Sequence, residues 1–289
     1  MKLKLIYNPA AGRGRAKHHA REVEQNLGNL GAEVDAYAST SPSDLTRAAA
    51  ESSRSGYDRV VVCGGDGTLN LALRDFDLAR GTLALVPLGS GDDFARVNGI
   101  PRSVSEACRI AVNGIVREVD VALANNLRYA GVAGLGFDSE VARYANERVK
   151  HLRGSAVYLY AILRVLPSFR PRRVRIDGRD EEIMFSVFGN SPQYGGGIRI
   201  TPGALLDDEQ LDACIVHRTS RFQLLKTLPR AYNGTHVKSA FVEMRRAREF
   251  HVESESTMDV YADGEPLTTT PVRFSIAAQK LKIVVSRSE

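Results

Sequence analysis

The sequence has no tryptophan, few cysteines and no long apolar run. Cys63, Cys108 and Cys214 are odd in number and widely spaced, and no Cys-x-x-Cys or Cys/His pattern of a zinc site is present. We interpret them as reduced, mostly buried thiols of a cytoplasmic protein. The most apolar stretch, residues 155–163, is far shorter than the roughly 20 residues that span a membrane, and the first residues do not resemble a signal peptide.

A strong excess of one charge is also absent. Lysine and arginine total 39 against 34 acidic residues, which gives a net charge of +5 and a sequence pI of about 9.1. This small excess suits an anionic ligand or surface but does not indicate nucleic acid, so we expect no nucleic-acid partner. With 43% apolar and 25% charged residues, the composition excludes a disordered chain, a coiled coil and a collagen-like repeat.

The first part of the chain alternates between predicted strands and helices. Its apolar runs lie at residues 3–7, 33–38, 59–63 and 82–87, and segments with helical spacing separate them. Strands that are apolar on both faces and separated by helices predict a parallel sheet covered on both sides. One helix is expected to begin at Ser41-Pro-Ser-Asp44, which places a capping residue before a proline.

Short strands dominate after about residue 116. Only three helical stretches interrupt them, near residues 139–148, 155–166 and 222–232. This change predicts an α/β domain over residues 1–120 and a β-rich domain over residues 121–289. The strands expected from residue 119 onward are 119–123, 129–133, 174–177, 183–188, 213–217, 249–253, 259–262, 272–276 and 281–285.

Three glycine-rich turns directly follow predicted strands of the first domain. Gly64-Gly-Asp-Gly-Thr-Leu-Asn70 follows one apolar strand and opens a helix, where backbone N–H groups can hold phosphate. Asp66 suits such a place if a divalent cation bridges it to the phosphate. Taken alone, the segment is equally consistent with a tight strand-to-helix turn. The turns at 8–14 and 89–93 favour a nucleotide site, because the carboxyl ends of parallel strands share one edge.

These turns resemble the catalytic domain of the diacylglycerol kinases, whose wider superfamily includes sphingosine, ceramide and bacterial lipid kinases and, more distantly, NAD kinases. The resemblance rests on Asn8-Pro-Ala-Ala-Gly12, the 64–70 segment and Pro87-Leu-Gly-Ser-Gly-Asp-Asp-Phe-Ala-Arg96. Matches continue downstream in the family's order and cover nearly the whole chain. They are Gly134-Leu-Gly-Phe-Asp138, Gly195-Gly-Gly-Ile-Arg-Ile-Thr-Pro202, Leu206-Asp-Asp-Glu-Gln-Leu-Asp212 and Asp263-Gly-Glu265.

The resemblance implies an N-terminal domain similar to those of NAD kinase and phosphofructokinase, a C-terminal β-sandwich that binds the acceptor, and ATP in the cleft between them. It implies that Asp263 is the general base and that Glu265 supports it or contacts the nucleotide. Asp66 would hold or orient Mg²⁺. A second, structural metal maps to the side chain of Asp208 and the carbonyls of Leu205 and Gln210. Nucleotide contacts map to Asn8, Pro9, Ala10, Ala11, Gly12, Thr40, Gly64, Gly65, Asp66, Gly67, Thr68, Leu69, Asn70, Ser90 and Asp92.

Two positions depart from the family pattern. Asp92 stands where the family usually has asparagine. Its carboxylate would repel a triphosphate unless Mg²⁺ or an arginine lies close. Glu209 stands where the Leu-Asp-Asp-Gly turn has glycine, so the structural metal loop departs from the family pattern. The segment Asp263-Gly-Glu265 also has a purely structural interpretation, because Asp-Gly is a strong hairpin signal.

The favoured hypothesis is an ATP- and Mg²⁺-dependent kinase that phosphorylates a hydroxyl of a lipid such as diacylglycerol or a sphingoid lipid. Two alternatives stay open: a kinase for a non-lipid acceptor, as in NAD kinase, and a nucleotide-binding protein without catalysis. We expect a cytoplasmic protein that meets its lipid acceptor at the inner membrane face. The basic segment 170–175 is either an ordinary solvated loop, the more common case, or a contact for anionic headgroups. The helix at 155–166 either borders an acyl chain or packs in the core, and the assembly, homodimer included, is left open.

Overall fold

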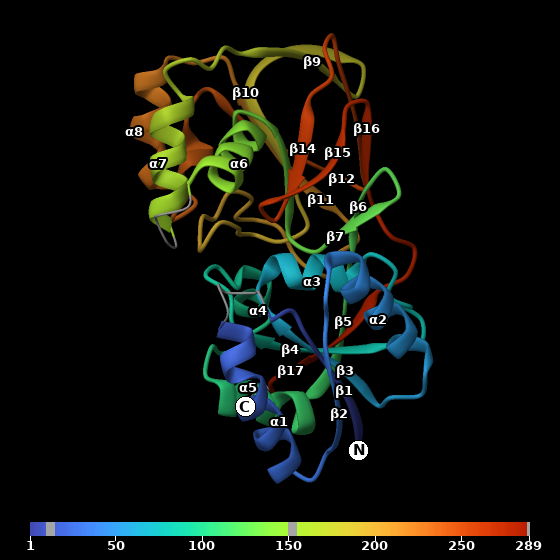
Figure 1. The fold of residues 1–289 in the computed structure, drawn as a ribbon. Helices are drawn as coiled ribbons and strands as arrows, with labels where there is room; N and C mark the ends of the chain where they lie inside the picture. Colours follow the sequence, from blue (N-terminus) through green and yellow to red (C-terminus); the bar gives the residue numbers. More distant parts are fainter. Residues whose placement is uncertain (10–14, 150–154, 288–289) are drawn as a thin grey trace. The chain divides into compact units, whose positions relative to one another are not determined.

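A computed structural model describes residues 1–9, 15–149 and 155–287 (Figure 1). The chain divides into two compact units, Met1–Val121 with Ala278–Glu289, and Ala122–Ala277. The first boundary lies beside the expected one at 120/121. The end of the chain differs from the expected range, because residues from Ala278 onward belong to the first unit.

The first unit contains a six-stranded sheet in the order β2-β1-β3-β4-β17-β5. The strands β1 to β4 are mutually parallel, β17 runs parallel to β4, and β5 is antiparallel to β17. Lys280, directly before β17, forms an ion pair of 3.3 Å with the buried Asp120. The strand bounds are β1 (Lys2–Tyr7), β2 (Glu33–Ala38), β3 (Arg59–Gly64), β4 (Thr82–Pro87), β5 (Ile115–Val119) and β17 (Leu281–Val285).

Helices cover both faces of this sheet, as expected for an α/β domain. The helices α1 (Arg15–Asn29) and α5 (Val104–Asn113) pack against each other on one face, and α2 (Pro42–Arg54) and α3 (Asp66–Leu73) pack together on the other (Figure 1). The predicted start of α2 is confirmed, because the Ser41 side chain accepts a hydrogen bond from the Asp44 N–H at 3.1 Å. The short α4 (Asp93–Val97) follows the turn after β4.

The second unit contains an eleven-stranded, mainly antiparallel sheet, which confirms the expected β-rich architecture. Its central strand β10 pairs with β8, β9 and β11. The strand bounds are β6 (Ala122–Ala124), β7 (Leu127–Tyr129), β8 (Val132–Gly136), β9 (Arg172–Ile176), β10 (Arg179–Gly189), β11 (Leu211–His217), β12 (Val242–Ala247), β13 (Glu249–Ser254), β14 (Asp259–Ala262), β15 (Glu265–Thr269) and β16 (Val272–Ile276).

Two apolar clusters stabilise the second unit. One is enclosed by the strands and centres on Phe188, which stacks on Phe274 with ring centroids 4.1 Å apart and contacts Phe250. The other lies under the helices and includes Phe137 and Phe169. These helices are α6 (Phe137–Arg148), α7 (Ser155–Val165) and α8 (Arg221–Ala231), and a short 3₁₀ helix, η2 (Thr235–Lys238), follows them.

Cys63, Cys108 and Cys214 are free and buried, as expected. Burial raises the pKa of each of the three thiols to about 12. They therefore contribute apolar volume rather than reactive thiolates. Among the described residues, no helix has both the length and the apolar character needed to cross a membrane.

Candidate functional site

The glycine-rich turns after β3 and β4 lie side by side at one edge of the parallel sheet. Gly64, the last residue of β3, is paired with Pro87, the last residue of β4, and its carbonyl accepts the Leu88 N–H at 3.0 Å. The end of β1 is in register with the same edge, since Tyr7 is opposite Cys63. Asn8 and Pro9 follow β1 there, whereas the predicted contacts Ala10, Ala11 and Gly12 lie outside the described residues.

The backbones of the two turns are in direct contact at Gly65 and Gly89. A Cβ atom placed on Gly65 would lie 2.9 Å from the Gly89 Cα, and one placed on Gly89 would lie 2.6 Å from the Gly65 Cα. Real Cβ contacts are essentially never this short, so both positions require glycine. Close backbone approach at the start of a helix is the geometry in which N–H groups bind phosphate.

The Asp66 side chain ties the first turn to α4. Its Oδ2 accepts the Asp93 N–H at 3.1 Å, and its Oδ1 accepts the Phe94 N–H at 3.2 Å. An ionised carboxylate has about four lone-pair positions, so two hydrogen bonds leave acceptor capacity on both oxygens. This half-buried oxygen donor fits a hard divalent cation such as Mg²⁺.

The unusual Asp92 is paired with an arginine. Asp92 is buried and adopts a left-handed conformation with φ of 52°, and its Oδ1 accepts the Gly89 N–H at 2.8 Å. Its Oδ2 lies 3.1 Å from the Arg102 Nε. Arg102 also donates to the carbonyls of Ser90 at 2.6 Å and Gly91 at 2.9 Å. The Asp92 carboxylate is thus neutralised by an arginine from beyond α4, and no local sequence pattern pointed to Arg102.

The other nucleotide-contact candidates differ in accessibility. Ser90 is exposed on the same turn. Thr40 is exposed at the start of α2, where its N–H and its hydroxyl both donate to the Asp44 carboxylate, at 2.9 and 3.1 Å. Gly64, Gly65 and Gly67 are half-buried, whereas the side chains of Thr68, Leu69 and Asn70 are buried in α3.

Asp263 occupies a two-residue hairpin turn between β14 and β15. Asp263 has φ of 48° and Gly264 has φ of 86°, so the hairpin interpretation of Asp-Gly is correct for the backbone. Both carboxylate oxygens are fixed, because Oδ2 accepts the Gly131 N–H at 3.0 Å and Oδ1 accepts the Val132 N–H at 2.8 Å. A Cβ on Gly131 would lie only 2.3 Å from Oδ1. Glu265 is exposed at the start of β15.

A second carboxylate, Asp138, lies in the first turn of α6 and was quoted above only as part of a motif. The Tyr194 hydroxyl, from the Gly195–Gly197 region, donates to its Oδ1. Burial raises the pKa of Asp138 to about 6 and raises that of Tyr194 well above its usual value. Asp138 packs on Gly134, which is paired with Tyr261 of β14, two residues before Asp263. The second unit therefore brings two of the family motifs together.

A possible metal cluster and a pocket lie elsewhere in the second unit. Single ligand atoms of Glu181, His217 and Glu243 lie within 4.8 Å of one another. The Arg245 guanidinium bonds Glu181 at 2.5 Å and Glu243 at 2.8 Å, so it supplies the positive charge there and we place no metal in this cluster.

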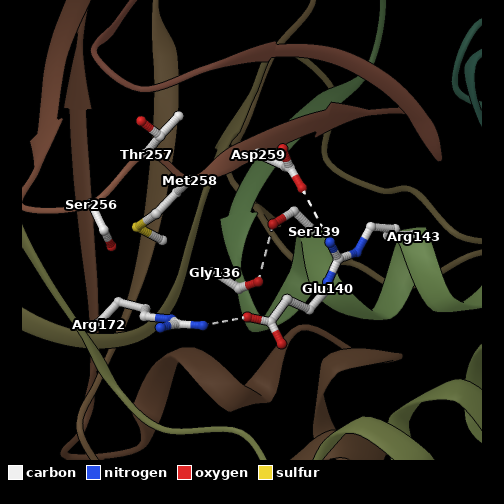
Figure 2. A pocket seen from close by; sticks show the side chains of 9 residues that line it. All are labelled: Gly136, Ser139, Glu140, Arg143, Arg172, Ser256, Thr257, Met258 and Asp259. Atoms are coloured by element: carbon white, nitrogen blue, oxygen red, sulfur yellow. Dashed lines mark hydrogen bonds and ion pairs between the residues drawn. The ribbon is translucent and has the colours of Figure 1, made fainter.

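Figure 2 shows the pocket, which lies among the start of α6, Arg172 of β9 and residues 256–259. Ion pairs line it, Arg172 with Glu140 at 2.8 Å and Arg143 with Asp259 at 3.7 Å (Figure 2). Its lining contains none of the residues predicted to bind nucleotide, metal or acceptor. The two arginines are already paired, so we assign no ligand to this pocket.

Comparison with known proteins accounts for both units. The family model of the diacylglycerol kinase catalytic domain matches residues 2–124, and that of the YegS C-terminal NAD kinase beta sandwich-like domain matches residues 131–285. The diacylglycerol kinase of Bacillus subtilis is 28% identical, covering 99% of this chain and 97% of the relative. That of Mycobacterium tuberculosis is 32% identical, covering 99% and 96%.

A solved structure of a candidate diacylglycerol kinase from Bacillus anthracis str. Sterne has a TM-score of 0.84 and 26% identity to this chain. The match covers 99% of this chain and 95% of that one. Motifs, fold and relatives agree over both units, and the chain belongs to the diacylglycerol kinase family.

Proposed function

We propose that the protein transfers the γ-phosphoryl group of ATP, with Mg²⁺, to a hydroxyl of a lipid such as diacylglycerol or a sphingoid lipid. The observation that carries the proposal is the backbone contact between Gly65 and Gly89 at the carboxyl edge of a parallel sheet. In a chain of the diacylglycerol kinase family, this contact supports a phosphate-binding role for the two turns.

The first unit supplies the donor chemistry in this proposal. Backbone N–H groups at 64–67 and the start of α3 hold the phosphates, and Asp66 would hold Mg²⁺. When bound, Mg²⁺ neutralises phosphate charge and orients the transferred group. Asn8, Thr40 and Ser90 would border the nucleotide. Arg102 keeps the second turn in shape by neutralising Asp92 and bonding two of its carbonyls.

The second unit supplies the acceptor chemistry. Asp263 takes the proton of the acceptor hydroxyl while the alcohol oxygen bonds to the γ-phosphorus and the bond to the ADP oxygen breaks. The N–H groups of Gly131 and Val132 hold both carboxylate oxygens, which supports a base with a fixed orientation. Asp66 belongs to the first unit and Asp263 to the second.

The exposed faces of α7 and α8 support a membrane-bound acceptor. Leu159 and Leu163 of α7 are 52% and 53% exposed, and Phe222 of α8 is 75% exposed. Both helices pack on the same apolar cluster through other residues. The exposed arginines Arg170 and Arg173 follow α7. Apolar side chains beside cations are suited to binding a surface of anionic lipid.

The deciding experiment is phosphoryl transfer from labelled ATP to a panel of diacylglycerol, sphingosine and NAD, each with and without Mg²⁺. We expect label only in a lipid and only with Mg²⁺. The folded Asp66→Ala variant serves as the inactive reference, with turnover lower by about 10²–10³. Transfer to NAD would establish the non-lipid alternative. ATP binding by calorimetry without transfer to any acceptor would establish a nucleotide-binding protein.

Membrane docking is tested separately by co-sedimentation with vesicles containing phosphatidylglycerol. We expect the double variant Leu159→Glu/Leu163→Glu to lose sedimentation while keeping activity on a short-chain, water-soluble diacylglycerol. Leu127→Glu is the matched control, since Leu127 is 42% exposed on β7, away from both helices in the fold. Equal losses in both variants, or no dependence on salt, would contradict docking through α7.

A further inference from the structure

The loop that leads into β11 is held by an arginine from the next strand. Arg246, on β12, donates through its Nη2 to the carbonyl of Gly203. The same guanidinium lies 3.0 Å from Oδ2 of Asp212, and its Nε donates to that oxygen at 3.1 Å. Its Nη1 lies 3.6 Å from Oδ2 of Asp208. One cation thus contacts a carbonyl and two carboxylates from three places along residues 203–212.

A second arginine stabilises the departure from the family turn. Glu209 has φ of 59°, the left-handed conformation that favours glycine, so the turn keeps its shape although the residue carries a side chain. The Glu209 carboxylate extends to Arg248, with an Oε2 to Nη2 distance of 2.8 Å.

These contacts do not fit the structural metal that the family resemblance implies at Leu205, Asp208 and Gln210. Oδ1 of Asp208 already accepts the Gln210 N–H at 3.1 Å, and Oδ2 faces Arg246. A divalent cation on Asp208 would have to sit beside the guanidinium that the buried Asp212 fixes in place. Carbonyl and carboxylate oxygens are the usual ligands of such cations, and of the three implied ligands the guanidinium contacts Asp208.

We infer that Arg246 replaces the structural cation in this protein, so that residues 203–212 are fastened to β12 by a guanidinium instead of a metal. The planar guanidinium is always charged and offers five donors, which suits several oxygens at once. The inference concerns the stability of the second unit and does not depend on the proposed phosphoryl transfer.

The test is thermal unfolding of the full chain without nucleotide, in EDTA, Mg²⁺ or Ca²⁺. We expect any change of Tm among the three conditions to be the same in the wild type and in Asp208→Asn. Arg246→Ala should lower the Tm in EDTA by about 5 °C, and Mg²⁺ or Ca²⁺ should restore part of the loss by occupying the vacated oxygens. Adding Asp208→Asn to Arg246→Ala should abolish that rescue. Arg248→Ala is the matched control, because its pair with Glu209 is exposed and should shift the Tm little.

Calorimetric titration of Mg²⁺ and Ca²⁺ into the folded wild type gives a readout that does not depend on a destabilised variant. We expect the wild type to have no saturable cation site that is lost in Asp208→Asn. A Tm that falls in EDTA and recovers with Mg²⁺ in the wild type but not in Asp208→Asn, or a binding site lost in Asp208→Asn, would overturn the inference. Asp208 belongs to the second unit, so these results are distinct from Mg²⁺ binding at Asp66 and from any failure of ATP-dependent turnover.

Discussion

Replacing Asp263 with asparagine separates its role in the turn from its proposed role as a base. The carboxylate uses one oxygen for each of two N–H groups, those of Gly131 and Val132. An amide has only one acceptor oxygen, so Asp263→Asn leaves one N–H facing an NH₂ group. An unsatisfied buried donor costs about 1–3 kcal/mol, which corresponds to a Tm lower by several degrees in a protein of this size.

The expected loss of catalysis is larger and has a different form. Removal of a general base should lower kcat about 10²–10⁴-fold, or about 3–5 kcal/mol in the barrier. A native protein with about 5–15 kcal/mol of stability remains folded after losing 1–3 kcal/mol, so unfolding cannot reproduce that loss of kcat well below the Tm. ATP affinity should change little in Asp263→Asn, whereas Asp66→Ala should weaken Mg²⁺-ATP binding as well as turnover.

The assay is turnover with labelled ATP beside ATP affinity by calorimetry, both at a temperature well below each variant's Tm. Gly131→Ala is an informative companion, because its Cβ would displace the Asp263 carboxylate without removing it. It should lower kcat in the same direction. Wild-type turnover in Asp263→Asn would refute the base and leave only the hairpin role. A loss of ATP affinity as large as in Asp66→Ala would place Asp263 at the donor site, with Glu265 the next candidate base.

Three further outcomes are expected. Gly89→Ala should reduce ATP affinity at least about tenfold, because its Cβ would separate the two turns. Gly28→Ala is the control, because its Cβ would meet no atom within 4 Å and the change should be neutral or stabilising. Equal ATP affinity in both variants would contradict the phosphate-turn assignment. Arg102→Gln should lower the free energy of unfolding by about 1–2 kcal/mol, because it leaves Asp92 without its guanidinium. Adding Asp92→Asn should restore most of the lost stability, measured by urea unfolding as a double-mutant cycle. Additive losses would refute the coupling. Burial raises the pKa of Asp138, so the folded state holds its proton more tightly than the unfolded state. The contribution of Asp138 to stability should therefore fall as pH rises from about 4 to about 6 and stay constant above. In urea titrations Asp138→Asn should lose this part of the pH dependence, and an unchanged slope would contradict the assignment.

The helices and strands of the first unit could be predicted from sequence, because each depends on residues close together in the chain. The start of α2 follows from Ser41 and Pro42, and the apolar runs of β3 and β4 follow from burial on both faces. The carboxyl edge of the sheet then follows from parallel pairing. In the second unit, β12 was missed because charged residues occupy much of it, with Arg245-Arg246 in place of an apolar alternation.

The parts of the candidate site that sequence reasoning missed depend on distant partners. Arg102 neutralises Asp92 from beyond α4, and Tyr194 reaches Asp138 across 56 positions. Asp66 caps α4 from 27 positions away. No spacing rule links such residues, because their proximity is a product of strand order and not of helix or strand periodicity.

The position of β17 has a consequence for how the chain is made. β17 lies between β4 and β5 and is separated from β5 by the whole of the second unit. During synthesis, at about 5–20 residues per second, Ala122–Ala277 leaves the ribosome before β17 does. The second unit can therefore complete its sheet first. In the first unit, the facing edges of β4 and β5 stay unpaired until β17 is available. A released chain truncated before Leu281 should accordingly be protected from protease over the second unit and open to protease along β4 and β5.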